Sequence, residues 1–235
     1  MPHENFRGPA PEGGKGDLHL TDRLCGVVGI SGDHGLHVHF DSFVSHVPTL
    51  VHLFFQIYVL FLLTVPIMTM RLVAEERRLR TIEMLLTAPV SESAVVFAKY
   101  LASLSLVALM LALSGAYAIT LGVVGEPDWG PIWSGYLGLF LLGAALVAVG
   151  LMTSSLVSNQ IIAALLSLSL FLLLWIIDHF GWMLPDPFDA LVVNLSLLVH
   201  FTPFATGSIF LSDAGFFVSV ALLALFLSVR ALARR

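Results

Sequence analysis

Charged side chains are scarce in this sequence, and cysteine is almost absent. Asp, Glu, Lys and Arg make up 11% of the 235 residues, whereas 57% of the residues are hydrophobic. Soluble domains carry about 25% charged residues, and a soluble fold could not bury this many apolar side chains. We therefore expect lipid to be the main solvent of the chain. The single cysteine, Cys25, excludes an intramolecular disulfide.

Two further absences narrow the function. The apolar runs 50–70, 101–124 and 132–177 contain no Asp, Glu, Lys or Arg, although ion-driven transporters normally keep such groups near the membrane midplane. An ATP site is missing too, because Gly16 stands where the phosphate loop that Gly13-Gly14-Lys15 faintly resembles needs Ser or Thr. No grouping of nucleophile and base supports an intramembrane enzyme. We therefore expect a membrane protein without an energy source of its own.

Five apolar segments are long enough to cross a membrane. The first has 21 residues and, at about 1.5 Å per residue in a helix, extends about 31 Å, enough for the hydrocarbon core. Every span must be helical, because lipid cannot satisfy free backbone groups. The predicted fold is an all-α integral membrane protein with five transmembrane helices, at about 50–70, 101–124, 136–156, 161–177 and 214–229.

The segment 188–210, which precedes the last span, is apolar but is interrupted by Pro203 and Gly207. The spans before and after it, 161–177 and 214–229, already cross the membrane in opposite directions, so no further crossing is needed between them. We therefore expect one or two short helices that dip into the outer leaflet. A pair of full transmembrane helices is the alternative.

Lys and Arg are distributed unevenly among the segments outside the spans. Segment 71–99 carries five of them and the tail 230–235 carries three, whereas 125–131 and 178–213 carry none. By the positive-inside rule, segment 71–99 and the C-terminus should face the cytoplasm. The four tryptophans agree, because all of them fall at the opposite interface, as an aromatic belt would. They are Trp129, Trp133, Trp175 and Trp182.

The N-terminal segment 1–47 is rich in Gly, Pro and His and contains no span. We expect it to be poorly ordered, or to be an aberrant start that replaces a native upstream helix. His34, His37 and His39 could bind zinc or copper as neutral imidazoles. A polar tail with unrelated histidines is the preferred interpretation, so we expect no metal site.

The charged segment between the first two spans has the pattern of an amphipathic helix at about 72–88. One stripe of this helix is apolar, and Glu76 precedes Arg80 by four residues on the opposite face, the favourable order for an ion pair. Pro89 ends the helix. Such a helix can lie along the membrane surface and offer its charges to a partner, whereas the alternative is a solvated loop that only fixes orientation. The apolar stripe comprises Leu72, Leu79, Ile82, Leu85 and Leu86.

The same segment carries a family resemblance. The run Thr69-Met-Arg-Leu-Val-Ala-Glu-Glu-Arg-Arg78, followed by Thr81-Ile-Glu-Met-Leu-Leu-Thr-Ala-Pro-Val90 and by Lys99-Tyr-Leu101, resembles the signature of type-2 ATP-binding-cassette (ABC) transporter permeases. The closest likeness is the bacterial branch that includes the gliding-motility permeases. The resemblance covers residues 48–235, which would form the transmembrane permease domain, and is most specific over 65–101.

The resemblance implies that the chain is the membrane subunit of an exporter in the cytoplasmic (inner) membrane of a bacterium. The charged segment would be its cytoplasmic coupling helix, seated in a groove of a separate ATPase. The residues that match the family motif, and would contact the ATPase, are Glu75, Glu76, Arg77, Arg78, Thr81, Glu83, Leu85 and Leu86.

The resemblance also implies the partners. These would be two copies of the ATPase, which would bind ATP and magnesium, and a second permease subunit that forms a homo- or heterodimer in membrane lipid. No cofactor is expected in this chain, and no nucleic acid as a partner. The sequence departs from the family at Arg80, where Gly is usual, and in 1–47, which has no counterpart of the first of the family's six helices. The alternative function is a non-transporting membrane scaffold that anchors a cytoplasmic protein through the same helix.

Overall fold

The computed structural model describes residues 50–79, 91–124, 127–183 and 188–233. All regular secondary structure in these ranges is helical, and five helical segments are long and apolar enough to cross a membrane. This confirms the predicted all-α membrane fold. The described elements are α3 (Val51–Thr69), α4 (Ala74–Arg78), α6 (Glu92–Val124), α7 (Trp129–Leu156), α8 (Gln160–Ile176), η1 (Ile177–Met183), α9 (Phe188–Val193), α10 (Leu197–Ala205) and α11 (Leu211–Ala233).

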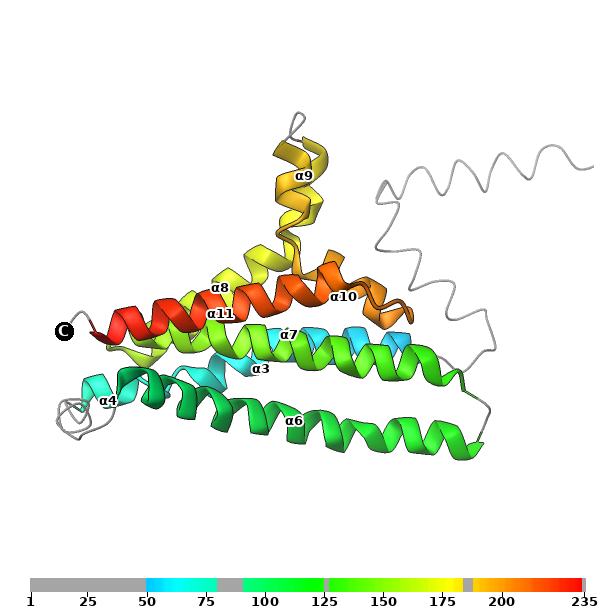
Figure 1. Cartoon of the computed structure of the whole chain (residues 1–235), viewed down its shortest axis with the longest axis horizontal. Coiled ribbons are helices and arrows are strands. Elements are labelled where there is room, and N and C mark those ends of the chain that lie inside the picture. Colours follow the sequence, from blue (N-terminus) through cyan, green and yellow to red (C-terminus); the bar gives the residue numbers. More distant parts are fainter. Residues whose placement is uncertain (1–49, 80–90, 125–126, 184–187, 234–235) are drawn as a thin grey trace, which may run out of the picture. The chain divides into compact units, whose positions relative to one another are not determined.

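Helix α7 occupies the centre of the bundle (Figure 1), with α3, α6, α8, α10 and α11 in contact with it. In the most apolar 18-residue stretch of α7, 72% of the residues are buried inside the bundle. The corresponding share is 17% in α6 and in α8. Three glycines allow this close packing, since a Cβ at Gly138 would overlap Phe204 and one at Gly143 would overlap Val107 of α6. At Gly150 the overlap would be with Thr69 of α3. Small residues let transmembrane helices approach closely without a hydrophobic driving force between them.

The last helix, α11, packs more extensively against α7 than any other described helix does. Its buried residues recur every three or four positions, which gives one face of the helix to the bundle. Small side chains dominate the middle of this face, with Ala221, Ala224 and Ser228 between the larger Phe217 and Leu232. The α7–α11 interface is therefore a second place where backbones come close.

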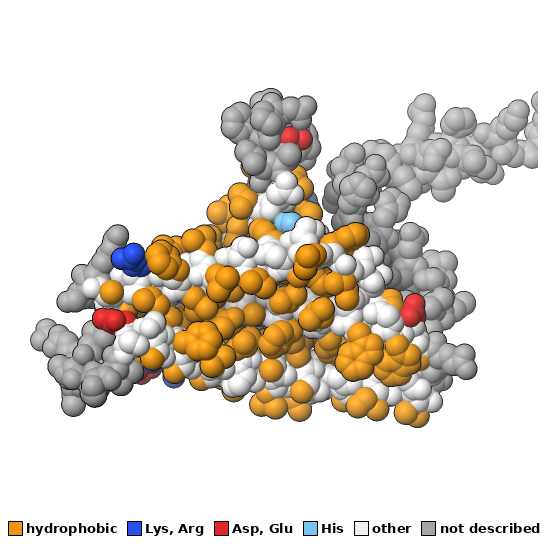
Figure 2. Space-filling model, in the orientation of Figure 1, with side chains coloured by type: hydrophobic (Ala, Val, Ile, Leu, Met, Phe, Trp, Pro, Cys, Tyr) orange, Lys and Arg blue, Asp and Glu red, His pale blue; other side chains and the backbone are white. Residues whose placement is uncertain are grey.

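The outward faces of the long helices are apolar. Figure 2 shows hydrophobic side chains over the middle of the bundle, whereas the charged side chains visible in this view lie at the ends of the long helices or near α9. Leu109 and Leu113 of α6 and Leu222 of α11 are all more than half exposed. Such large exposed residues along every outer helix would destabilise a soluble protein, but they match lipid tails. The chain is a multi-pass membrane protein.

Helix starts follow capping residues. Asp128 accepts a hydrogen bond from the main-chain N–H of Gly130 at 3.0 Å and so caps α7. Asn159 accepts one from Ile161 at 2.9 Å and caps α8. Side-chain oxygens at these positions satisfy N–H groups that lack a partner within the helix. The cap at Asn159 explains why the uncharged run 132–177 divides into two helices, as the sequence predicts.

The segment before the last span contains two short helices, α9 and α10, rather than a transmembrane pair. Pro203 lies within α10, and Gly207, at φ 98°, ends the turn that follows the helix. The N–H of Ser208 donates to Pro203 O at 2.9 Å and closes this turn. The depth of both helices in the membrane stays a prediction.

Several helix boundaries differ from those predicted from the sequence. Helices α6 and α7 begin at Glu92 and Trp129 rather than at 101 and 136. The apolar-run criterion stops at charged or turn-forming residues, but a helix continues through the interface, where charged side chains such as Lys99 find polar partners. In the charged segment, residues 71–73 form a turn, so the helix begins at Ala74 and not at 72. Residues 80–90 lie outside the described part of the chain.

Candidate functional site: the α4 junction

The short helix α4 is bonded to the ends of three long helices at the end of the bundle where α11 ends (Figure 1). We call this group the α4 junction. It consists of the turn 70–73, helix α4, Lys99 of α6, Ser154 of α7 and Ala231 of α11.

The hydroxyl of Ser154 organises the turn between α3 and α4. It donates to Met70 O at 3.1 Å and accepts from the N–H groups of Val73 at 3.2 Å and Ala74 at 3.1 Å. The chain stops being helical at this turn, so these main-chain groups would otherwise lack partners. One hydroxyl offers one donor and two acceptor sites, and Ser154, fully buried, uses all three. The end of α7 is thereby fixed to the start of α4.

Lys99 connects α6 to the same junction. Its Nζ lies 2.6 Å from Glu76 Oε1 and donates to Leu72 O, also at 2.6 Å. The Lys99 and Glu76 side chains are 20% and 31% exposed, so the pair is partly shielded from water. Charge-assisted bonds of this length are stronger than bonds between neutral groups.

Arg77 connects α4 to α11. The residue is 9% exposed, and its Nη2 donates to Ala231 O at 3.0 Å. The last carbonyls of a helix have no partner within the helix, and a basic side chain there also complements the helix dipole. Arg77 therefore caps the C-terminal end of α11 from a neighbouring helix.

The residues expected to contact an ATPase divide into two groups. Arg78 is exposed and Glu75 is half-buried, whereas Arg77 faces α11 and Glu76 pairs with Lys99. Two of the expected contact residues, Glu76 and Arg77, are thus engaged in bonds within the junction. The remaining four, Thr81, Glu83, Leu85 and Leu86, lie outside the described residues.

Sequence reasoning did not assign Ser154 or Lys99 a role of their own. Lys99 belongs to a motif that carries the family resemblance, but a motif does not reveal contacts. For Lys99 a signal was available, because a lysine inside a helical pattern at the edge of an apolar run needs a partner or water. For Ser154 no such signal exists, because Ser155 beside it has the same polarity and is also buried.

A second polar cluster lies near the other end of α7, where α10 meets α11. His200 Nδ1 is 2.8 Å from Asp213 Oδ1, and His200 Nε2 is 3.0 Å from Asn194 O. The imidazole stacks on Phe216, with 4.0 Å between ring centroids. We define the α10–α11 junction as α10 with Asn194, Asp213 and Phe216.

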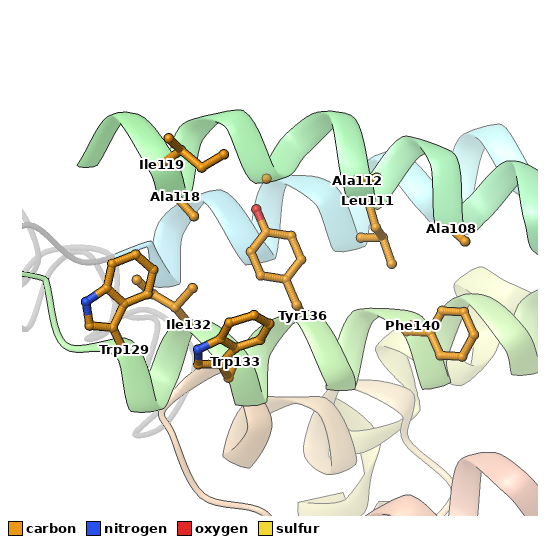
Figure 3. Close-up of a pocket in the computed structure, with 11 residues that line it drawn as sticks. Ala108, Leu111, Ala112, Ala118, Ile119, Trp129, Ile132, Trp133, Tyr136 and Phe140 are labelled. Atoms are coloured by element: carbon orange, nitrogen blue, oxygen red, sulfur yellow. The ribbon is translucent and has the colours of Figure 1, made fainter. Parts of the chain in front are cut away.

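An apolar groove separates α6 from α7 (Figure 3), with a volume of about 530 Å³. The rings of Trp129, Trp133 and Tyr136 line it from α7, while Ile119 and Leu111 of α6 lie on the other wall. Its lining offers almost no polar atoms, and the Tyr136 hydroxyl is 3.4 Å from Ser114 Oγ. An apolar lining of this kind favours a hydrocarbon chain as the occupant of the groove.

Among the described residues, His, Cys, Asp and Glu form no group of three that could hold a metal ion.

The helical membrane bundle and the tethered helix between its first two described spans are the features of a transporter permease. The family model described as "ABC-2 family transporter protein" matches residues 39–233, and the chain belongs to this family. It is therefore a permease subunit of an ABC transporter. Permeases of this family normally work with an ABC ATPase partner. No match was found among the curated proteins or among the solved structures.

Proposed function

We propose that this permease subunit couples ATP hydrolysis by a separate ATPase to export across the cytoplasmic membrane, and that force enters through the α4 junction. The observation that carries the proposal is the set of bonds from α4 to three long helices. Ser154, Lys99 and Arg77 supply one attachment each. Family membership supports the ATPase partner, and the density of Lys and Arg in segment 71–99 supports a cytoplasmic location.

The mechanism follows from these attachments. A movement of α4 must either carry the ends of α6, α7 and α11 with it or break its bonds to them. An ATPase that binds α4 differently in its ATP-bound and ATP-free states would therefore shift the bundle between two packings. Helix α7 would transmit this shift furthest, because it contacts most of the other described helices.

The roles of the expected contact residues divide accordingly. Arg78 and Glu75 are accessible for contact with the ATPase, together with Leu79, which is 63% exposed. Glu76 and Arg77 act as positioning residues that hold α4 at the angle needed for docking. Thr81, Glu83, Leu85 and Leu86 complete the proposed docking surface.

The proposed assembly holds two ATPase copies and a second permease subunit, identical or homologous, in the inner membrane of a bacterium. The exposed apolar faces of α6 and α8 offer surface for the second subunit or for lipid. ATP and magnesium bind to the ATPase, and this chain holds no cofactor. Within the family we propose the branch that includes the gliding-motility permeases, which the motif residues of segment 69–101 support. In this orientation both the α4 junction and the C-terminus are cytoplasmic.

The test is Ser154→Ala in the permease co-purified with its ATPase and reconstituted in lipid nanodiscs. The substitution leaves two buried N–H groups and one carbonyl without their partner, at a cost of about 1–3 kcal/mol. We expect the ATPase to remain bound while ATP hydrolysis falls about fivefold, the factor that 1 kcal/mol produces.

Ser155→Ala is the matched control. Ser155 is buried like Ser154, but its hydroxyl donates to Met152 O within its own helix at 2.7 Å. Its loss should leave hydrolysis unchanged. An assembled Ser154→Ala complex that hydrolyses ATP at the wild-type rate would refute coupling through the junction. A wild-type complex with a cytoplasmic partner but without ATP hydrolysis would favour the scaffold function.

A further inference from the structure

A groove with basic and apolar walls lies between α4, α7 and α11. Its volume is about 700 Å³, and among the described residues that line it, Arg77 and Arg230 are charged. Leu156, Phe226 and Leu227 form its apolar wall. We call this the basic groove. It is distinct from the apolar groove of Figure 3, which α6 and α7 form.

The two arginines hold positive charge at fixed places in this groove. The bond from Arg77 Nη2 to Ala231 O fixes one guanidinium against the end of α11. The other, Arg230, is exposed, and its Cζ lies 5.3 Å from the centre of the Phe226 ring, within the range of a cation–π contact. Long basic side chains near the end of a membrane helix reach towards the headgroup layer. Both charges therefore lie where lipid phosphates are found.

The apolar wall excludes most other anions as the preferred occupant. Leu156 is 55% exposed and Phe226 is 56% exposed, and Figure 2 shows basic side chains beside hydrophobic surface at this end of the helices. A free phosphate would meet the arginines but leave the apolar wall uncovered. A phospholipid meets both, since its phosphate pairs with guanidinium groups and its acyl chains cover aliphatic and aromatic side chains.

From this complementarity we propose that the basic groove binds an anionic phospholipid of the leaflet at the α4 end. The phosphate lies between Arg77 and Arg230, and the acyl chains run along Phe226 and Leu227. A bound lipid would fill the space beside the α4 junction and hold Arg77 against α11. The local lipid composition would then affect how firmly α4 is attached.

Native mass spectrometry of the full-length protein in a mild detergent tests the proposal. Phosphatidylglycerol and phosphatidylcholine are added separately, and bound lipids are counted. We expect the wild-type protein to retain phosphatidylglycerol in preference to phosphatidylcholine. Arg230→Gln should weaken phosphatidylglycerol binding about fivefold, the effect of one basic residue near an anionic surface, and leave phosphatidylcholine unaffected. Arg230→Lys keeps the charge and should restore most of the binding.

Arg71→Gln is the matched control, because Arg71 is an exposed arginine in the turn before α4 and does not line the groove. It should retain wild-type binding. Equal loss in Arg71→Gln and Arg230→Gln would overturn the proposal in favour of unspecific surface charge. Equal retention of both lipids by the wild-type protein would reduce the groove to an apolar surface. Displacement by millimolar inorganic phosphate would identify a free-anion site instead. The measurement requires no ATPase, so its outcome is independent of the proposed coupling.

Discussion

The two ends of α7 are held by different kinds of contact. At the α4 junction, Ser154 and Lys99 bond to main-chain groups of the turn 70–73 and of the first residue of α4. At the α10–α11 junction, Phe201 and Phe204 are fully buried, and Phe201 lies 5.2 Å from the ring centre of Tyr58 in α3. Hydrogen bonds add to this aromatic packing, from Ser134 Oγ to Phe204 O at 2.7 Å and between His200 and its two partners.

We call the α4 junction the joint and the α10–α11 junction the anchor, because the two should respond differently to displacement. Hydrogen bonds weaken steeply when distance or angle departs from ideal, so a polar contact is either made or broken. Close-packed aromatic rings lose many contacts at once, or clash with their neighbours, when they are displaced. The α4 junction can therefore change between discrete arrangements at modest cost, whereas the α10–α11 junction resists displacement. Three experiments test this distinction.

The largest effect is expected from Phe204→Ala in the anchor. Removing a fully buried phenyl ring costs about 3–5 kcal/mol, and the ring also packs against Gly138 and Phe217. We expect a markedly lower unfolding temperature of the purified protein in detergent. Phe210→Ala is the control, since Phe210 is 55% exposed and should change the unfolding temperature little. Similar shifts for both variants would show that aromatic packing does not anchor this end.

A smaller effect is expected from His200→Ala. Its loss removes the imidazole that contacts both Asp213 and Asn194 O, at a cost of about 1–3 kcal/mol for buried groups left without a partner. Thermal unfolding should shift less than in Phe204→Ala. His179→Ala is matched to it, because His179 also contacts an aspartate but its side chain is 65% exposed. That variant should remain within about 0.5 kcal/mol of the wild type.

The smallest stability effect is expected at the joint. A double-mutant cycle with Lys99→Met and Glu76→Gln should give a coupling energy of about 0.5–1 kcal/mol, typical of a partly exposed ion pair. ATP hydrolysis by the assembled complex should nevertheless fall more in Lys99→Met than in Phe204→Ala complexes that remain folded. A Lys99→Met complex with wild-type hydrolysis would remove the distinction between joint and anchor.

The sequence predicted the fold best where composition alone determines it. Helices α3 and α8 end within a residue or so of the apolar runs 50–70 and 161–177, because lipid requires an uninterrupted helix there. The interruptions at Pro203 and Gly207 correctly predicted short helices before the last span. Helix ends were missed where polar residues continue the helix beyond the hydrocarbon layer, as they do before Lys99.

The site was predictable only to the level of a segment. Adjacent residues of a helix point about 100° apart, so the direction of each depends on how the helix is rotated against its neighbours. Arg77 is buried and Arg78 exposed, and Ser154 rather than Ser155 contacts the turn before α4. Nothing in the local sequence distinguishes the members of these pairs. The choice is made by packing between residues that lie far apart in the chain.

The extensive α7–α11 interface has a consequence for how the protein is made. Helix α11 is the last described helix to be synthesised, yet its Ala221, Ala224 and Ser228 belong to the face that covers the central helix. Until α11 has been synthesised, the small side chains of α7 remain exposed to the bilayer. Arg77 also lacks its hydrogen-bond acceptor, the carbonyl of Ala231. A nascent chain arrested before residue 211 would have an incompletely covered bundle, which cellular quality control could recognise. The bond from Arg77 to Ala231 therefore forms only after α11 has been inserted.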